Sequence, residues 1–171
     1  MIQSYKELLE WSRINKKQVK QAFKIIRKWK PKIQDAWFEE KHDEAFEKID
    51  CLNCANCCKT TSPIFRDKDI ERLSKHFRIK PGQLIADHLH LDGDQDYVLN
   101  SAPCPFLDED NSCSVYDARP NACREYPHTN RKKMVQILTL TETNVDVCPA
   151  VSHIIKQLPI PSTVKSPNER M

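Results

Sequence analysis

Apolar residues recur at helical spacing through the first fifty residues. They predict a helix over residues 1–30, whose inward face carries Tyr5, Leu9, Val19, Ala22, Phe23 and Ile26. Pro31 breaks or kinks this helix, because proline lacks the amide proton that a helix interior needs. A second helix then runs to about Ile49, with an inward stripe of Phe38, His42, Ala45, Phe46 and Ile49. The pattern predicts an N-terminal helical pair over residues 1–50, in which His42 is a core residue rather than a ligand.

Shorter elements are predicted after residue 60. Asp67 is the expected N-cap of a helix through Phe77, and Pro81 suits the first turn of another helix. Asp92-Gly93-Asp94 has the composition of a polar turn. A short strand is expected at 97–99. The segment 103–107 then predicts a small hairpin that turns at 108–111 and returns over 113–116.

The C-terminal third mixes helix and irregular chain. One helical turn bounded by prolines is expected between Arg119 and Pro127, and Pro149 opens a last helix. Residues 131–147 fit a helix or a strand. The tail 159–171 has the composition of disordered chain. The sequence therefore predicts a mainly α, small α+β protein with an irregular, metal-held, cysteine-rich centre, in which residues 51–158 form the cysteine-cluster domain.

Composition narrows the function classes. The charged fraction is 30%, the mean hydropathy is −0.65, and no apolar run reaches the ~18 residues of a membrane helix. The N-terminus lacks the apolar core of a signal peptide, so a cytoplasmic protein is expected. A secreted disulfide framework is the alternative interpretation of the cysteines, and the missing export signal disfavours it. Only two glycines occur, which excludes glycine-rich nucleotide loops.

Charge divides sharply between the first two predicted helices. Residues 1–32 hold ten basic and two acidic residues, a net charge of +8, whereas residues 33–50 carry −5. A basic helix can contact nucleic acid or anionic lipid. An antiparallel pair in which the two helices screen each other accounts for the same pattern. Since no aromatic-interleaved RNA motif accompanies the charges, nucleic-acid binding is not expected.

The chemistry of the chain is concentrated in eight cysteines. They are Cys51, Cys54, Cys57, Cys58, Cys104, Cys113, Cys123 and Cys148. A Cys-x-x-Cys step lets two thiolates converge on one centre. Adjacent side chains usually diverge, so Cys57 and Cys58 are expected to serve two nearby centres, or one of them supports a centre without binding its metal. Eight thiolates at four per centre then predict two sites, for tetrahedral zinc or for iron–sulfur clusters.

The order of these motifs resembles a known family. Cys51-x-x-Cys54-x-x-Cys57-Cys58 is followed by Cys104-Pro-Phe-Leu, by Cys113-Ser-Val-Tyr, and by Arg119-Pro-x-x-Cys123-Arg-x-Tyr-Pro. This combination resembles the CxxCxxCC cysteine-cluster family of zinc- or iron-chelating proteins, also called YkgJ-like, over about residues 51 to 150. The resemblance implies metal chelation and, more weakly, redox or iron–sulfur chemistry. It does not extend to the N-terminal helices.

Four thiolates on zinc, or on an oxidised cubane cluster, leave a net charge of −2, which nearby cations offset. Lys59, Arg119 and Arg124 are near the cysteines in sequence and are the candidates for this role. His128 ranks below the thiols as a ligand. The expected function is a non-catalytic metal-binding module for zinc, iron or an iron–sulfur cluster. An iron–sulfur oxidoreductase or protein-modifying enzyme is the alternative, so the question of catalysis stays open.

Overall fold

The computed structural model describes residues 4–160. The chain is mainly helical and has one small antiparallel sheet among these residues, which confirms the predicted fold class. Chain contacts group it into two compact units. One unit combines the described residues 4–45 and 130–160, and the other is Phe46–Thr129. The domain division predicted from the sequence, with a helical pair over 1–50 and a cysteine-cluster domain over 51–158, stays a prediction. Of the expected tail, residues 161–171 lie outside the described residues.

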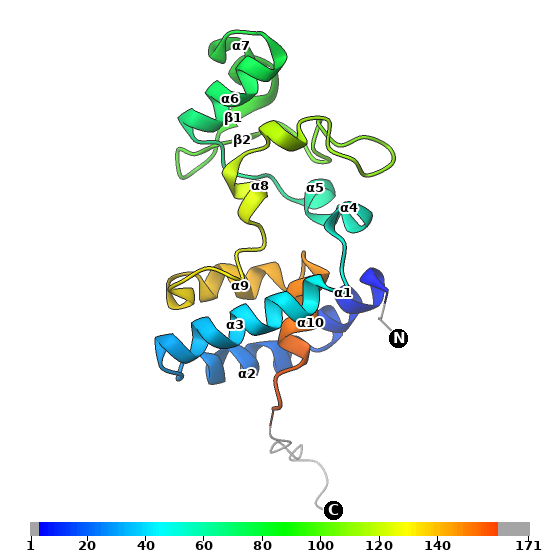
Figure 1. Cartoon of the computed structure of the whole chain (residues 1–171), viewed down its shortest axis with the longest axis vertical. Helices are drawn as coiled ribbons and strands as arrows, with labels where there is room; N and C mark the ends of the chain where they lie inside the picture. The colour runs from blue at the N-terminus through cyan, green and yellow to red at the C-terminus, as the bar shows by residue number, and fades with distance from the viewer. Residues whose placement is uncertain (1–3, 161–171) are drawn as a thin grey trace, which may run out of the picture. The chain divides into compact units, whose positions relative to one another are not determined.

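The first unit is a helical bundle (Figure 1). Its helices are α1 (Tyr5–Ile14), α2 (Lys16–Ile26), α3 (Pro31–Phe46), α9 (Leu138–Asn144) and α10 (Pro149–Lys156), with a 3-10 turn η2 (Met134–Gln136) before α9. Residues 131–147, which fitted helix or strand, are thus mainly helical. Phe23, Phe38 and Ile154 are fully buried. Buried hydroxyls support this packing, because Ser152 Oγ donates to the carbonyl oxygen of Leu8 at 2.5 Å.

The single helix expected over residues 1–30 is two helices that meet at Asn15. The Asn15 side-chain amide and backbone N–H both donate to the carbonyl oxygen of Trp11, each at 2.9 Å. An asparagine side chain that bonds nearby backbone in this way competes with helix continuation. Pro31 is the first residue of α3, as a proline at a helix start should be.

Ion pairs in this unit join α2 to α9 and residues within α3. Arg27 pairs with Glu142 of α9 at 2.8 Å, while Lys41 pairs with Glu40 and Glu44 of its own helix at 3.0 and 2.8 Å. The exposed residues of α2 are Lys16, Lys17, Lys20 and Lys24. Mutual screening of the two helices stays a prediction.

The second unit contains the elements that surround seven of the cysteines. They are α4 (Cys51–Cys54), α5 (Asn56–Thr60), α6 (Asp67–Phe77), α7 (Pro81–His88), β1 (Leu89–Leu91), β2 (Tyr97–Leu99), η1 (Tyr116–Ala118) and α8 (Asn121–Glu125). The apolar core of this unit consists of Phe65, Ile70, Leu73, Leu84, Leu89, Leu99, Phe106, Val115 and Ala118. Helices α6 and α7 lie beside the small sheet (Figure 1).

The hairpin differs in part from its prediction. Strand β2 pairs with the preceding β1, with Leu89 opposite Leu99, and the polar Asp92–Asp96 turn joins them. The predicted return over 113–116 is reduced to one bridge between Leu107 and Cys113. Apolar burial explains the outcome, because Leu89 and Leu99 both enter the core, whereas 108–112 are polar turn residues. Helix α6 begins one residue earlier than expected, with Arg66 rather than Asp67 as its N-cap.

Candidate metal centre

The first cysteines lie on two short helices separated by a sharp turn. Asp50 caps α4, because its carboxylate accepts from the backbone N–H of Leu52 at 2.9 Å. Ala55 ends α4 in the left-handed conformation, with φ 46° and ψ 17°, and it is 3% exposed. A residue with a Cβ rarely adopts this conformation, which costs roughly 1–2 kcal/mol. Strained backbone of this kind gathers at functional sites, and here it reverses the chain between Cys54 and Cys57.

The thiols of Cys57 and Cys58 lie close to each other. Their Sγ atoms are 4.0 Å apart, within range of a sulfur hydrogen bond and far from a disulfide bond length. The hydrogen bond from Cys57 is the largest cause that lowers the pKa of Cys58 to about 7, and Lys59 adds to it. The lowered pKa favours the thiolate of Cys58, which is the form that binds a metal.

The later cysteines are brought back to Cys58 by the backbone. The backbone N–H of Cys104 donates to the carbonyl oxygen of Cys58 at 2.8 Å, which fixes residues 104 and 58 side by side. Cys113 then bridges Leu107, three residues beyond Cys104. Cys123 lies in the first turn of α8, where its N–H donates to the Pro120 carbonyl oxygen at 3.0 Å. Chain segments fifty residues apart in sequence thus meet near one thiol.

Electrostatic effects identify a set of four neighbouring thiols. Burial is the main cause that raises the pKa of Cys123 to about 12, and Cys58, Cys104 and Cys113 all add to the effect. Burial also raises the pKa of Cys104, with additions from Cys58 and Cys113. The pKa of Cys113 is raised by burial and by Cys58. Every pair among these four is therefore linked by such an effect in one direction, and we call Cys58, Cys104, Cys113 and Cys123 the thiol quartet.

Cys51 and Cys54 are linked to the quartet through Cys58. Cys51 is exposed as a residue, yet desolvation of its sulfur raises its pKa to about 11, with further contributions from Cys54, Asp50 and Cys58. Burial is also the first cause of the raised pKa of Cys54. Cys58 thus belongs to both groups of thiols.

Cys148 lies in the other unit. It is 6% exposed at the start of α10, and its backbone N–H donates to the Asn144 carbonyl oxygen at 2.8 Å. The seven other cysteines lie in Phe46–Thr129. The assignment of Cys148 as a ligand stays a prediction.

The donor set suits a thiophilic metal. Within residues 4–160, no three His, Cys, Asp or Glu side chains are arranged tightly enough to hold a metal ion. The fit is therefore one of chemistry: seven neighbouring thiols, six of them half-buried, are the soft ligands that zinc and iron–sulfur centres take. The four thiolates of the quartet would hold such a group, and their negative charge would offset the positive charge of the metal.

Comparison with known proteins gives one match. Residues 50–149 fit the model of the CxxCxxCC family, described as "Putative zinc- or iron-chelating domain". The chain belongs to this family. The searches of curated proteins and of solved structures found no match to this chain. The resemblance drawn from the cysteine spacing is confirmed, and family membership supports metal binding without deciding between zinc and iron. The helices over residues 4–160 include none long and apolar enough to cross a membrane.

The three predicted cations of the CxxCxxCC domain differ in what they contact. Lys59 opposes the burial that raises the pKa of Cys54 and favours the thiolate of Cys58. Arg119 opposes the raised pKa of Cys113 and of Cys123. Its guanidinium also stacks on the ring of Tyr116, 3.7 Å from the centroid. These two cations lie where they can offset thiolate charge.

Arg124 and His128 make other contacts. Arg124 Nε donates to the Arg119 carbonyl oxygen at 3.1 Å, and its Nη2 donates to the Asp117 carbonyl oxygen. His128 Nδ1 lies 3.8 Å from a carboxylate oxygen of Glu125. The Arg124 side chain therefore donates to backbone carbonyl oxygens between Cys113 and Cys123.

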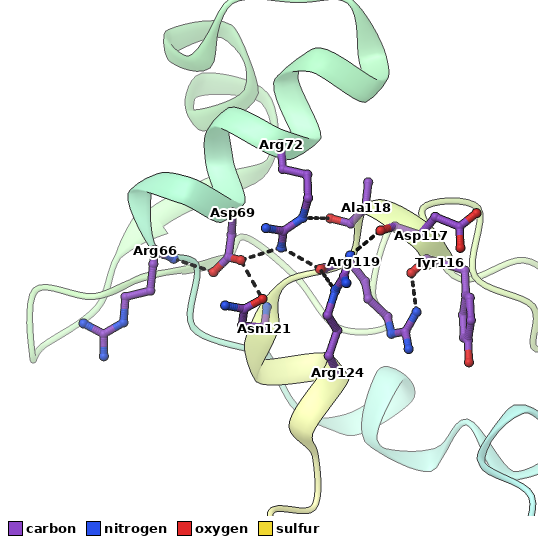
Figure 2. Close-up of polar contacts among 9 residues, drawn as sticks. All are labelled: Arg66, Asp69, Arg72, Tyr116, Asp117, Ala118, Arg119, Asn121 and Arg124. Carbon is purple, nitrogen blue, oxygen red and sulfur yellow. Dashed lines mark hydrogen bonds and ion pairs between the residues drawn. The ribbon is translucent and has the colours of Figure 1, made fainter.

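Sequence reasoning missed Asp69 and Arg72 of α6. Figure 2 shows both side chains reaching the segment 116–124 of the CxxCxxCC domain. The signal was present, since an aspartate at the third position of a helix followed by an arginine three residues later forms a common ion pair. Its partners in the cysteine segment, nearly fifty residues away, could not be inferred from that pattern.

Proposed function

We propose that the CxxCxxCC domain binds zinc or iron through its thiolates, as a single ion or as an iron–sulfur cluster, and that the protein is a non-catalytic metal-binding module of the cytoplasm. The thiol quartet carries this proposal. Four thiolates complete a tetrahedral zinc site or hold a cubane cluster, and each pair of thiols in the quartet is linked by an electrostatic effect.

The ligands would divide between two centres. Cys58, Cys104, Cys113 and Cys123 form the first. Cys51, Cys54 and Cys57 would contribute to the second centre predicted by the count, and metal ligation by Cys148 is a separate proposal. This division sends the adjacent Cys57 and Cys58 to different centres, as the divergence of neighbouring side chains predicts.

Offsetting charge supports the first centre. Arg119 acts on Cys113 and Cys123, and Lys59 acts on Cys58, so three of the four quartet sulfurs have a cation near them. Such partners tune a metal site, and changing them commonly lowers metal affinity. These cations would stabilise the excess negative charge of a four-thiolate centre.

An iron–sulfur oxidoreductase or protein-modifying enzyme is the second candidate. Pro105 and Pro149 directly follow cysteines, a sequence feature of iron–sulfur ligands. The thiol cluster is not accompanied in sequence by a recognisable nucleophile–base pair, which favours the non-catalytic module. No nucleic-acid partner forms part of this proposal.

The test is an anaerobic preparation from cells grown with both zinc and iron. Metal content, acid-labile sulfide and the visible spectrum are measured on the intact chain. A brown protein with iron and sulfide selects the cluster, and a colourless protein with stoichiometric zinc selects the single ion. A protein that retains neither metal, and whose eight cysteines alkylate freely under native reducing conditions, contradicts the proposal.

A further inference from the structure

The carboxylate of Asp69 is the buried centre of a hydrogen-bond network in the cysteine unit. It is 1% exposed and accepts three hydrogen bonds (Figure 2). Its Oδ1 accepts from Arg72 Nη2 at 2.6 Å and from the backbone N–H of Asn121 at 3.1 Å. Its Oδ2 accepts from the backbone N–H of Arg66 at 3.0 Å. One carboxylate thus joins the first turn of α6 to the first residue of α8.

Arg72 extends the network to the segment before α8. Its Nε donates to the carbonyl oxygen of Ala118 at 3.1 Å, and its Nη2 donates to that of Arg119 at 2.8 Å. Arg124 Nε donates to the same Arg119 carbonyl oxygen. The planar guanidinium presents several donors in a fixed geometry, which a lysine cannot reproduce. We call Asp69 and Arg72 the α6 clamp.

The clamp acts on the stretch of chain that connects two quartet cysteines. Cys113 precedes the clamped carbonyls and Cys123 follows them, and α8, which bears Cys123, begins at the clamped Asn121. Little apolar packing holds this stretch, since between residues 114 and 126 the buried residues are Val115, Ala118 and Pro120. The path of the backbone from one thiol to the other therefore depends on these polar bonds.

A buried ion pair is a weak source of stability, because desolvation cancels much of the attraction between the charges. Its hydrogen bonds are directional, however, and fix the groups they join. We propose that the α6 clamp positions Cys113 and Cys123 for metal binding, so that Asp69 and Arg72 set the affinity and geometry of the quartet centre without contacting the metal. This inference rests on the proposed function.

The test compares Asp69→Asn and Arg72→Lys with the wild type as intact chains. Asp67→Asn is the matched control, because this substitution removes the same charge from the same helical turn. Asp67 is exposed and lies outside the clamp. Zinc affinity is measured by competition with a chelator. Co(II) is the spectroscopic probe, since its visible bands report the symmetry of a thiolate site. Thermal unfolding of each variant is recorded in parallel.

Asp69→Asn is expected to lower zinc affinity ~10- to 100-fold and to shift the Co(II) bands, as loss of a supporting hydrogen bond commonly does. Arg72→Lys retains the positive charge but cannot donate to the carbonyl oxygens of Ala118 and Arg119 at the same time. It should therefore shift the Co(II) bands and lower zinc affinity by a smaller factor. Asp67→Asn should match the wild type. Should Asp69→Asn not fold, Arg72→Lys decides the question alone.

Wild-type affinity and Co(II) bands in a folded Asp69→Asn or in Arg72→Lys overturn the clamp, even if their thermal stability falls. Those results leave the proposed function intact. A wild-type chain that binds neither zinc nor Co(II) under reducing conditions contradicts both proposals, so the two failures are distinguishable.

Discussion

Metal removal should unfold the cysteine unit while the helical bundle stays folded. The perturbation is a membrane-permeant or soluble chelator under reducing, anaerobic conditions. Apolar packing differs along the chain: from residue 50 to 64 the single buried residue is Ala55, whereas α10 alone buries Val151, Ile154 and Ile155. A segment with so few buried apolar side chains depends on other interactions to stay ordered, and metal ligation supplies them.

The expected magnitude follows from binding linkage. A ligand that binds only the folded state at 1,000 times its dissociation constant stabilises it by about 4.1 kcal/mol. A domain of 60–100 residues changes its melting temperature by about 4–8 °C for each kcal/mol. Chelation should therefore lower the transition of the cysteine unit by about 15–30 °C, and the transition of the bundle should stay within a few degrees.

Hydrogen–deuterium exchange resolved by peptide is the assay. Peptides from residues 50–64 and 101–129 should lose protection on chelation, and peptides from α1, α2 and α10 serve as the internal control. A chelator already saturated with zinc should leave every peptide unchanged. Equal protection of all peptides after metal loss has been verified by elemental analysis would refute the reasoning.

Four further outcomes are expected. Cys123→Ser should lose the metal of the quartet centre, and Cys148→Ser should lower the metal content per chain; full metal content in Cys148→Ser would remove this residue from the ligand set. At pH 8, filling the quartet should release about three protons, because Cys58 has a pKa of about 7 while the other three have raised values, and binding should weaken as pH falls; titration calorimetry in two buffers measures the number, and release of one or none would contradict the assignment. Ala55→Gly should stabilise the cysteine unit by about 0.5–1 kcal/mol by removing a left-handed Cβ, as judged by urea unfolding, with destabilisation as the opposing result. RNA binding should be undetectable both for the wild type and for a variant in which the four exposed lysines of residues 16–24 are replaced by glutamine. A salt-sensitive micromolar affinity of the wild type that is lost in the variant would overturn that expectation.

The sequence determined the features that depend on neighbouring residues. Pro31, Pro81 and Pro149 each begin a helix, since the missing amide proton and restricted φ of proline suit that position. The Asp92-Gly93-Asp94 turn is present because its side chains bond their own backbone, as when Asp94 N–H donates to Asp92 at 2.9 Å. The family was recognisable for the same reason, because its signature is the order and spacing of cysteines along the chain.

Long-range packing decided the rest. Strand β2 pairs with β1 because Leu89 and Leu99 share a core, which the hydrophobic pattern of either strand does not specify. Residues 130–160 pack with the N-terminal helices. Cys148 therefore lies in a different unit from the other seven cysteines.

The site shows the same division. Spacing identified the thiols, but not the quartet, which depends on the Cys104–Cys58 backbone hydrogen bond across 46 positions. The clamp depends on the fold still more, because Asp69 and Arg72 find their acceptors and donors nearly fifty residues away. Ligand identity is written in residue type and local spacing, whereas ligand position depends on backbone contacts between distant segments, and those form only in the folded chain.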